Sequence, residues 1–396
     1  MSAPDFKELM ARETPKLLAC VHCGLCLDEC PTYRTSGDET NSPRGRLALW
    51  RAEWEGRLTP GPETDHYTDL CVACLACTTA CPANVPYAEL LTARREEQAR
   101  RRGADWRIRA LSPLLAAPKL FNALASPLRL IRRLGLRPHP MLPAGAPAIF
   151  ESSAAYARRV EKALRPSRSR AALFEGCLME AAFREVNAAT IRVLAVNGIA
   201  VDLPERQTCC GAVAEHAGMP AEKEKLDEAN REAFAASALV LTNSSGCGLS
   251  LRHALGNAQQ DVVDFLGTLD LVPGAEQFPP KAWYDHPCHA FHGLGIRTAP
   301  ARLLKAAGLE GRWSLAPEAD RCCGGGGAYA ELQPESSRAI LEEKRALLGP
   351  LPQGALLITS NHVCMMQWSR IPGLQVRHAV QVLDESYRLA GYYSKI

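Results

Sequence analysis

The chain has little net charge and no long apolar run. Its 396 residues include 46 lysines and arginines against 43 acidic residues. A net charge of +3 gives no general attraction to nucleic acid, and no nucleic-acid-binding motif is present. No uncharged apolar run approaches the roughly 18 residues that span a bilayer. The start, MSAPDFKELMARETPKLLAC, lacks the layout of a secretory signal, so we expect a cytoplasmic protein. Peripheral association with the inner face of the cell membrane stays open.

Cysteine is abundant, with 16 residues, in a chain that is otherwise of ordinary globular composition. Hydrophobic residues make up 47% and charged residues 22%, and the length predicts two or three domains. Without a secretory signal, so many thiols indicate a reducing compartment. There, thiolates bind metals more often than they form disulfides.

Half of the cysteines lie in two dense runs, 20–31 and 71–82, that both read C-x2-C-x2-C-x3-C-P. In this motif three thiolates bind one iron–sulfur cube and the fourth binds the neighbouring cube. Structural zinc sites usually separate two C-x2-C pairs by a longer arm, so zinc or a disulfide is disfavoured. The motif predicts two [4Fe-4S] clusters: a first held by Cys20, Cys23, Cys26 and Cys81, and a second held by Cys71, Cys74, Cys77 and Cys30.

The segment between the runs predicts a helix over residues 41–56. Ser42 can cap it, Pro43 suits its first turn, and Gly56 can end it. Residues 86–102 predict a further helix after the second run. One face of the first helix carries its large apolar residues, Leu47, Trp50 and Trp54.

A basic segment follows. Residues 94–137 hold eleven arginines and one lysine against three acids, and short apolar pieces alternate with prolines. Such a segment is either a docking surface for a partner subunit or an anionic membrane, or a solvated connector whose arginines cover apolar neighbours. We favour the connector, because excess charge alone is weak evidence for a site. The proline-rich stretch 139–153 indicates a domain boundary.

The other eight cysteines form an internal repeat. In each half a predicted strand delivers a cysteine, a helix ends at glycine, a short strand precedes a CCG triplet, and an apolar strand leads to the last cysteine. Strands alternating with helices predict parallel sheets, whose ligands gather at the carboxyl ends of the strands. Each half can therefore bring four sulfurs together at one redox metal site. Structural zinc, buried structural cysteine and a regulatory disulfide remain the alternatives. The two sets are Cys177, Cys209, Cys210 and Cys247, and Cys288, Cys322, Cys323 and Cys364.

Two weaker signals lie in the second half. Gly325, Gly327 and Ala330 match a dinucleotide-binding pattern loosely, but they follow a cysteine pair, so we expect the glycines to let backbone amides approach a sulfur. Three histidines flank Cys288. Local hydrogen bonding is the favoured role over metal ligation for His286, His289 and His292.

These motifs together resemble a known family. CVHCGLCLDECPTY with GDETNSPRGR, then QTCCGA, NSSGCG and CCGGGGAY, are similar to the iron–sulfur subunits of glycolate oxidase (glycolate dehydrogenase) over nearly the whole chain. The broader group includes iron–sulfur subunits of anaerobic glycerol-3-phosphate dehydrogenase, lactate-utilisation proteins and heterodisulfide reductase subunits. Modules of the heterodisulfide reductase type often end in C-x2-C. Here Ser244 and Asn361 replace that additional thiol, which disfavours non-cubane clusters and disulfide reduction.

The resemblance implies an α+β multidomain fold. We expect a mainly helical two-[4Fe-4S] ferredoxin domain (1–105), a basic helical connector (106–168), and two α/β cysteine-rich CCG modules with parallel sheets (169–275 and 276–396). It also implies an electron-transfer subunit that is not catalytic alone. An FAD-binding partner would oxidise a 2-hydroxy acid, most simply glycolate to glyoxylate, and a quinone or another acceptor would take the electrons. The alternatives are a lactate or glycerol-3-phosphate complex, a catalytic heterodisulfide-reductase-like chain, and a cluster-based redox sensor. An additional cluster or zinc in the CCG modules stays open.

Overall fold

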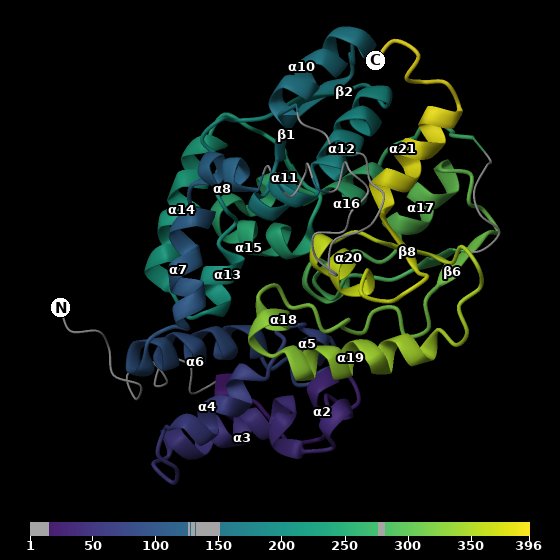
Figure 1. Cartoon of the computed structure of the whole chain (residues 1–396). Coiled ribbons are helices and arrows are strands. Elements are labelled where there is room, and N and C mark those ends of the chain that lie inside the picture. Colours follow the sequence, from purple (N-terminus) through teal and green to yellow (C-terminus); the bar gives the residue numbers. More distant parts are fainter. Residues whose placement is uncertain (1–15, 126, 128–130, 132–150, 276–281) are drawn as a thin grey trace. The chain divides into compact units, whose positions relative to one another are not determined.

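The computed structural model describes residues 16–125, 127, 131, 151–275 and 282–396 (Figure 1). The chain forms two compact units. The first unit takes the described parts of Met1–Ser112 with Ala212–Lys223 and Asp320–Leu347, and the second unit takes those of Pro113–Gly211, Glu224–Ala319 and Leu348–Ile396. These units do not follow the order of the predicted modules, since two later segments return to the first unit. The predicted domain boundaries therefore stay a prediction.

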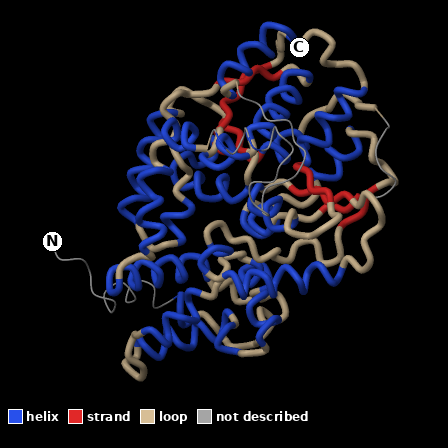
Figure 2. Tube along the Cα trace, viewed as in Figure 1, coloured by secondary structure: helices blue, strands red, loops and turns tan. Residues whose placement is uncertain are grey.

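The described part of the first unit is helical, as Figure 2 shows by its lack of strands. This confirms the helical N-terminal region that the motifs predict. Its elements are α2 (Pro31–Ser36), η1 (Glu39–Asn41), α3 (Pro43–Trp54), α4 (Pro62–Asp69), α5 (Ala76–Ala80), α6 (Tyr87–Arg102), α13 (Ala212–His216), α18 (Tyr329–Leu332) and α19 (Pro334–Leu347). Two helices cross the boundary between the units, α7 (Trp106–Leu115) and α14 (Pro220–Ala233).

Helix α3 forms as the sequence predicts. The Ser42 hydroxyl accepts a hydrogen bond from the Gly45 amide at 3.0 Å, and Pro43 occupies the first turn. Trp50 is fully buried, stacks on Tyr87 with ring centroids 5.6 Å apart, and donates to the Thr68 hydroxyl at 3.0 Å. The helix thus fixes the core against which both cysteine runs pack.

The start of the basic segment is part of this core. Arg94 on α6 is fully buried and contacts three carboxylates: Glu53 at 3.0 Å, Asp65 at 3.0 Å, and Glu97. The expectation of a solvated connector is therefore wrong for this arginine, because the guanidinium neutralises acids that α3 and α4 bury. The segment 132–150 lies outside the described residues.

The second unit contains two four-stranded parallel sheets with the same strand order, β2-β1-β3-β4 and β6-β5-β7-β8. This confirms the duplicated α/β prediction, although the outer strands β4 and β8 were not predicted. The strands are β1 (Ser169–Phe174), β2 (Ile199–Asp202), β3 (Val240–Thr242), β4 (Gln259–Asp261), β5 (Ala282–Tyr284), β6 (Trp313–Leu315), β7 (Leu356–Thr359) and β8 (Gln375–His378).

Helices of both modules share one core in this unit. Helix α12 packs on α21, and α16 packs on α17, so residues of both sheets join a single apolar cluster. Arg192 on α12 also forms a bidentate ion pair with Asp384 on α21, at 2.7 and 2.6 Å. The helices are α8 (Pro118–Leu124), α10 (Ser153–Leu164), α11 (Cys177–Ala182), α12 (Arg184–Val196), α15 (Ser245–Leu255), η2 (Gly256–Ala258), α16 (Val262–Gly267), η3 (a π-helical turn, His289–Gly293), α17 (Ala299–Ala306), α20 (His362–Trp368) and α21 (Ala379–Leu389).

Among the helices that the structure describes, none combines the length and the apolar character needed to cross a membrane.

Replacing Arg94 tests the buried ion network of the first unit. We expect Arg94→Met to destabilise the chain by about 3–5 kcal/mol, because it leaves buried carboxylates without their counter-charge. Denaturant unfolding of the anaerobically isolated protein, followed by circular dichroism, measures the loss. Arg51→Gln is the matched control, since Arg51 makes an exposed pair with Glu55 whose removal costs at most about 0.5 kcal/mol. Equal midpoints for the two variants would contradict the network.

His378 gives a pH-dependent prediction for the second unit. Its Nδ1 accepts from the Val380 amide at 3.2 Å and its Nε2 donates to the Asn243 carbonyl at 3.0 Å, so the neutral ring is satisfied on both sides. Burial lowers the pKa of His378 to about 4. An unfolded histidine titrates near 6.5, so its stabilising contribution is present above about pH 6.5 and is lost as pH falls toward about 4.

The experiment compares wild type with His378→Gln at pH 7 and pH 5. We expect the difference in unfolding free energy to shrink at pH 5. Other titrating groups contribute equally to wild type and variant, so their contributions cancel in the difference. Asp261 is one of them: burial raises its pKa to about 7, and its contribution to stability has the opposite pH dependence. A difference that stays constant or grows at pH 5 would show that the fold does not lower the pKa of His378.

Candidate functional site

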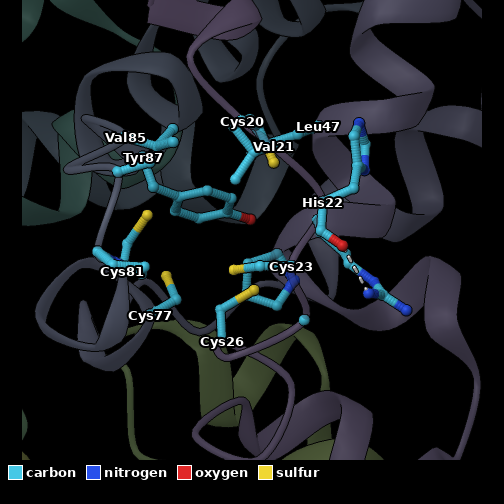
Figure 3. A pocket seen from close by; sticks show the side chains of 15 residues that line it. Cys20, Val21, His22, Cys23, Cys26, Leu47, Cys77, Cys81, Val85 and Tyr87 are labelled. Atoms are coloured by element: carbon cyan, nitrogen blue, oxygen red, sulfur yellow. Dashed lines mark hydrogen bonds between the residues drawn. The ribbon is translucent and has the colours of Figure 1, made fainter.

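The first predicted cysteine set surrounds one cavity of the first unit (Figure 3). Cys20, Cys23, Cys26 and Cys81 all line it, and so do Cys77 and Tyr87. The left-handed Gly24 (φ +89°) makes the tight loop between the first cysteines. Arg44 supports this loop by donating to the His22 carbonyl at 3.0 Å. Cys23 is exposed and its three companions are half-buried, so solvent reaches this cavity.

The second predicted set surrounds a second cavity, and all four members are buried: Cys30, Cys71, Cys74 and Cys77. Cys30 lies at the start of α2 and the others precede or enter α5. The loop before α5 needs left-handed backbone at Ala73 (φ +60°) and Leu75 (φ +67°). Thiols from residues 41 positions apart therefore meet, as the crossed pattern predicts. That these thiols bind iron stays a prediction.

A buried guanidinium contacts the second cavity. Arg46, 1% exposed, points Nη1 at the Cys30 sulfur at 4.0 Å and donates to the Thr32 hydroxyl at 3.0 Å. Its Nε donates to the Tyr67 carbonyl at 2.5 Å. Burial raises the pKa of the Cys30 thiol, while the charge of Arg46 opposes that shift. The site therefore supplies one fixed positive charge where it excludes water.

Tyr87 lies between the two cavities. Tyr87, Cys77 and Pro43 line both of them, so the cavities share a wall. The Tyr87 hydroxyl donates to the Cys71 sulfur at 3.7 Å. Two donors, Arg46 and Tyr87, thus reach sulfurs of the second set. Sequence reasoning missed both residues, because neither belongs to a cysteine motif.

The donor sets suit iron–sulfur cubes. Each predicted set places four thiols around its cavity on largely apolar walls, and sulfur is the donor that such clusters take. In the described residues, no three histidine, cysteine, aspartate or glutamate side chains are placed to bind one metal ion together. A cube differs from a single ion in taking each thiolate on a different iron atom.

The first CCG set also comes together. The sulfurs of Cys177 and Cys209 are 3.5 Å apart. Hydrogen bonding with Cys177 raises the pKa of Cys209, and hydrogen bonding with Cys210 raises that of Cys247, so the four thiols form a chain of contacts. The CCG turn is held by Asn230, which accepts from the Thr208 amide at 3.0 Å and donates to the Cys209 carbonyl at 3.0 Å. All sixteen cysteines lie in the described residues and none is in a disulfide.

The second CCG set is divided between the units. Cys322 and Cys323 belong to the first unit, and Cys288 and Cys364 to the second, so their convergence stays a prediction. Within the first unit, a hydrogen bond with Cys322 lowers the pKa of Cys74. The Gly324 amide donates to the Cys322 sulfur at 3.3 Å, which is the backbone approach that we expected of these glycines.

The two positions that lack a fifth thiol meet each other in the second unit. The Ser244 hydroxyl donates to Oδ1 of Asn361 at 2.8 Å and lies 3.0 Å from Nδ1 of His362. Asn361 also donates to the Cys364 sulfur at 3.5 Å. Neutral hydrogen bonds therefore join the ends of β3 and β7, at the two positions where modules that end in C-x2-C have a cysteine.

The histidines near Cys288 lie in aromatic and local contacts. His286 is buried, with its ring edge-on to Tyr284 (4.9 Å) and Phe291 (5.1 Å). His289 and His292 lie on the π-helical turn η3, and His292 contacts Phe291 at 5.0 Å. The roles of these three histidines stay a prediction.

Comparisons with known proteins agree with both regions. Residues 16–85 match a family model described as a 4Fe-4S dicluster domain, and residues 171–252 and 282–369 match a cysteine-rich domain. The "Probable glycolate oxidase iron-sulfur subunit" of Bacillus subtilis (strain 168) is 31% identical over 92% of this chain and 90% of its own length. The "Glycolate oxidase iron-sulfur subunit" of Escherichia coli (strain K12) is 28% identical over 93% of this chain and 94% of its own.

A shorter relative matches as well. "Lactate utilization protein A 1" of Bacillus mycoides (strain KBAB4) is 32% identical over 55% of this chain and 98% of its own length. The full-length similarity, together with the order of one dicluster domain and two cysteine-rich domains, assigns the family. This chain belongs to the family of glycolate oxidase iron–sulfur subunits.

Proposed function

We propose that this chain is the electron-transfer subunit of a flavin-dependent 2-hydroxy-acid dehydrogenase complex that oxidises glycolate to glyoxylate. Its partner would be an FAD-binding subunit, and its acceptor a quinone or another oxidant. The observation that carries this proposal is the pair of four-cysteine cavities that share a wall at Tyr87. Two [4Fe-4S] clusters bound there would carry one electron at a time. They could therefore reoxidise, in two steps, a partner flavin that has taken two electrons from the substrate.

The chain's own residues would have three tasks. Cys20, Cys23, Cys26 and Cys81 would hold the first cluster, and Cys30, Cys71, Cys74 and Cys77 the second. Arg46 and the Tyr87 hydroxyl supply positive charge and a hydrogen bond to sulfurs of the second set, at 4.0 and 3.7 Å. Tyr87, which lines both cavities and stacks on buried Trp50, would exclude water from the wall between them. The first CCG set offers four further sulfurs for an additional cluster.

Cavity exposure suggests a direction for electron flow. Cys23 is exposed at the first cavity, whereas all four cysteines of the second are buried. A partner flavin can therefore approach the first cavity more closely. We infer that electrons enter at the first cavity and pass toward the second.

Lactate and glycerol 3-phosphate are the alternative substrates, since the substrate would bind the partner and not this chain. The lactate-utilisation relative favours the first of these, but it spans only 55% of this chain. A catalytic disulfide reductase is disfavoured, because the Ser244–Asn361 hydrogen bond occupies the positions of the additional thiols. For that alternative, the isolated chain would have to reduce a disulfide without a flavoprotein.

The test of the proposal is anaerobic co-purification with candidate FAD-binding subunits from the same organism. We expect a coloured complex in which glycolate bleaches the cluster absorption and yields glyoxylate. Iron and sulfide counts of about eight would indicate two cubes, and about twelve a third cube in the CCG modules. An iron-free chain, or one that oxidises glycolate with no partner, would overturn the proposal. Reduction by lactate or glycerol 3-phosphate and not by glycolate would replace the substrate.

Arg46 gives a prediction with a spectroscopic readout. We expect Arg46→Gln to lower the reduction potential of the second cluster only, because a buried positive charge stabilises the more negative reduced form. A tenfold change in the ratio of reduced to oxidised cluster corresponds to about 59 mV for one electron. Redox titration followed by electron paramagnetic resonance measures this shift.

Two companions make the Arg46 test decisive. Arg46→Lys keeps the charge and should restore most of the potential. Arg51→Gln removes a surface charge of α3 that pairs with Glu55 and lines neither cavity, so neither potential should shift measurably. If Arg46→Gln leaves the second potential unchanged, the buried guanidinium does not set it.

A further inference from the structure

The first unit contains a larger cavity of about 480 Å³ that no cysteine motif predicts. It lies among the end of α6, the start of α7, α13 and the turn leading into α18. Its volume falls within the range of small-molecule sites, about 300–1,000 Å³. All of its lining residues belong to the first unit. The cavity is thus a property of one compact body.

One wall of this cavity belongs to the second cysteine loop. Cys71 lines both this cavity and the second cysteine cavity, and Val72 lines them as well. Arg95 fixes the wall by donating to the Cys71 carbonyl at 2.6 Å. The Tyr329 hydroxyl fixes it from the other side by donating to the Leu70 carbonyl at 3.1 Å. Only the shared wall of Cys71 and Val72 would separate a molecule in this cavity from the second cysteine set.

The lining combines aromatic faces with hydrogen-bond donors. Trp106 is 74% exposed and Tyr329 is 6% exposed, so one aromatic residue lies toward solvent and the other at depth. Buried Ile108 adds apolar surface, and Gln98 and His216 add polar groups. Apolar and aromatic walls with a few polar groups are the usual lining of a small-molecule site, and this combination suits a planar ring that carries acceptor oxygens.

The charge of the lining is positive. Four arginines line the cavity against two aspartates. Arg102 pairs with Asp69 at 2.7 Å and Arg107 pairs with Asp105 at 2.9 Å, which balances those charges. The other two arginines, Arg95 and Arg109, leave a net positive field. Such a field stabilises negative charge that develops on a ligand oxygen.

We propose that this cavity binds the headgroup of a quinone and is where electrons leave the chain. The inference rests on the proposed electron-transfer function and adds the acceptor class and its site. Reduction of one quinone to one quinol consumes two electrons and two protons. A cluster held by Cys30, Cys71, Cys74 and Cys77 would supply the electrons one at a time, and water that reaches the cavity beside exposed Trp106 would supply the protons. Arg109 would donate to a carbonyl oxygen while Trp106 and Tyr329 pack on the ring.

The experiment uses the full chain with reconstituted clusters and needs no flavoprotein. The chain is reduced by dithionite, desalted, and mixed anaerobically with menadione while the cluster absorption recovers. We expect the rate of reoxidation to saturate with menadione. Ala104→Trp, which fills the cavity from its lining, and Arg109→Glu, which reverses an exposed charge on it, should each slow reoxidation at low menadione at least about tenfold.

Controls separate a site effect from damage to the chain. Arg57→Glu reverses an exposed arginine outside the cavity and should leave menadione reoxidation unchanged. Reoxidation by ferricyanide, which can react at the exposed first cavity, should be equal in all variants. Binding of 2-heptyl-4-hydroxyquinoline N-oxide, followed by quenching of its fluorescence, should weaken in the two cavity variants and not in the control.

The proposal is overturned if menadione reoxidises the cavity variants as fast as wild type, or if the rate never saturates. It is also overturned if the quinoline oxide binds all variants equally. Because dithionite supplies the electrons, these outcomes are independent of any flavoprotein. Failure of glycolate to reduce the complex would instead count against the proposed function and leave the quinone site intact.

Discussion

The buried charge of Arg46 is the constraint on which the second cysteine site depends. Four thiols are withdrawn from water there, and burial, reinforced by neighbouring thiols, raises the pKa of Cys30 and Cys77. A site of this kind is stable with a negative group only if a positive charge is buried with it. Arg46 supplies that charge from the second turn of α3, and the cap at Ser42 and Pro43 fixes where that turn begins. The insertion between the two cysteine runs is therefore part of the site and not a spacer.

Duplication explains the second unit. Both sheets have the same strand order, and both place cysteines and polar residues at the carboxyl ends of their central strands. At the last positions the copies have diverged: Asp261 caps α16, whereas His378 caps α21. Burial raises the pKa of Asp261 to about 7 and lowers that of His378 to about 4, so both caps favour the neutral form. A shared core of α12, α16, α17 and α21 then joins the copies into one body.

The sequence was sufficient for the motif-bearing parts of this architecture. Cysteine spacing predicted which thiols meet in the two cavities, and glycine and proline placed α3, α12 and α17. The outer strands β4 and β8 were not predictable from the sequence, since QQD and QVRH show no apolar run and gain their order from pairing with β3 and β7. The roles of Arg46, Arg94 and Tyr87 were not predictable for a different reason. Their roles come from burial among distant residues, which periodicity and spacing do not encode.

The contrast between an exposed first set and a buried second set arises from a segment far along the chain. The two cysteine runs have the same motif, so their difference in exposure cannot come from the runs themselves. Residues 320–347 return to the first unit directly around the second CCG pair. Gly326 there is so close to Val72 that a Cβ would lie 2.9 Å from its side chain, and Arg34 on α2 pairs with Glu343 on α19 at 2.7 Å.

This returning segment covers the second run and leaves the first open. In doing so it brings Cys322 to Cys74 and Tyr329 to the loop of Cys71. The residues that shield the second cysteine set from water are thus the same ones that contact Cys74 and the loop of Cys71. Burial of the second set and its contacts with the returning segment therefore have one structural cause. The close approach to Val72 leaves no room for a side chain at Gly326, whereas at Gly324 a Cβ would meet Ser337 and Ile340 of α19.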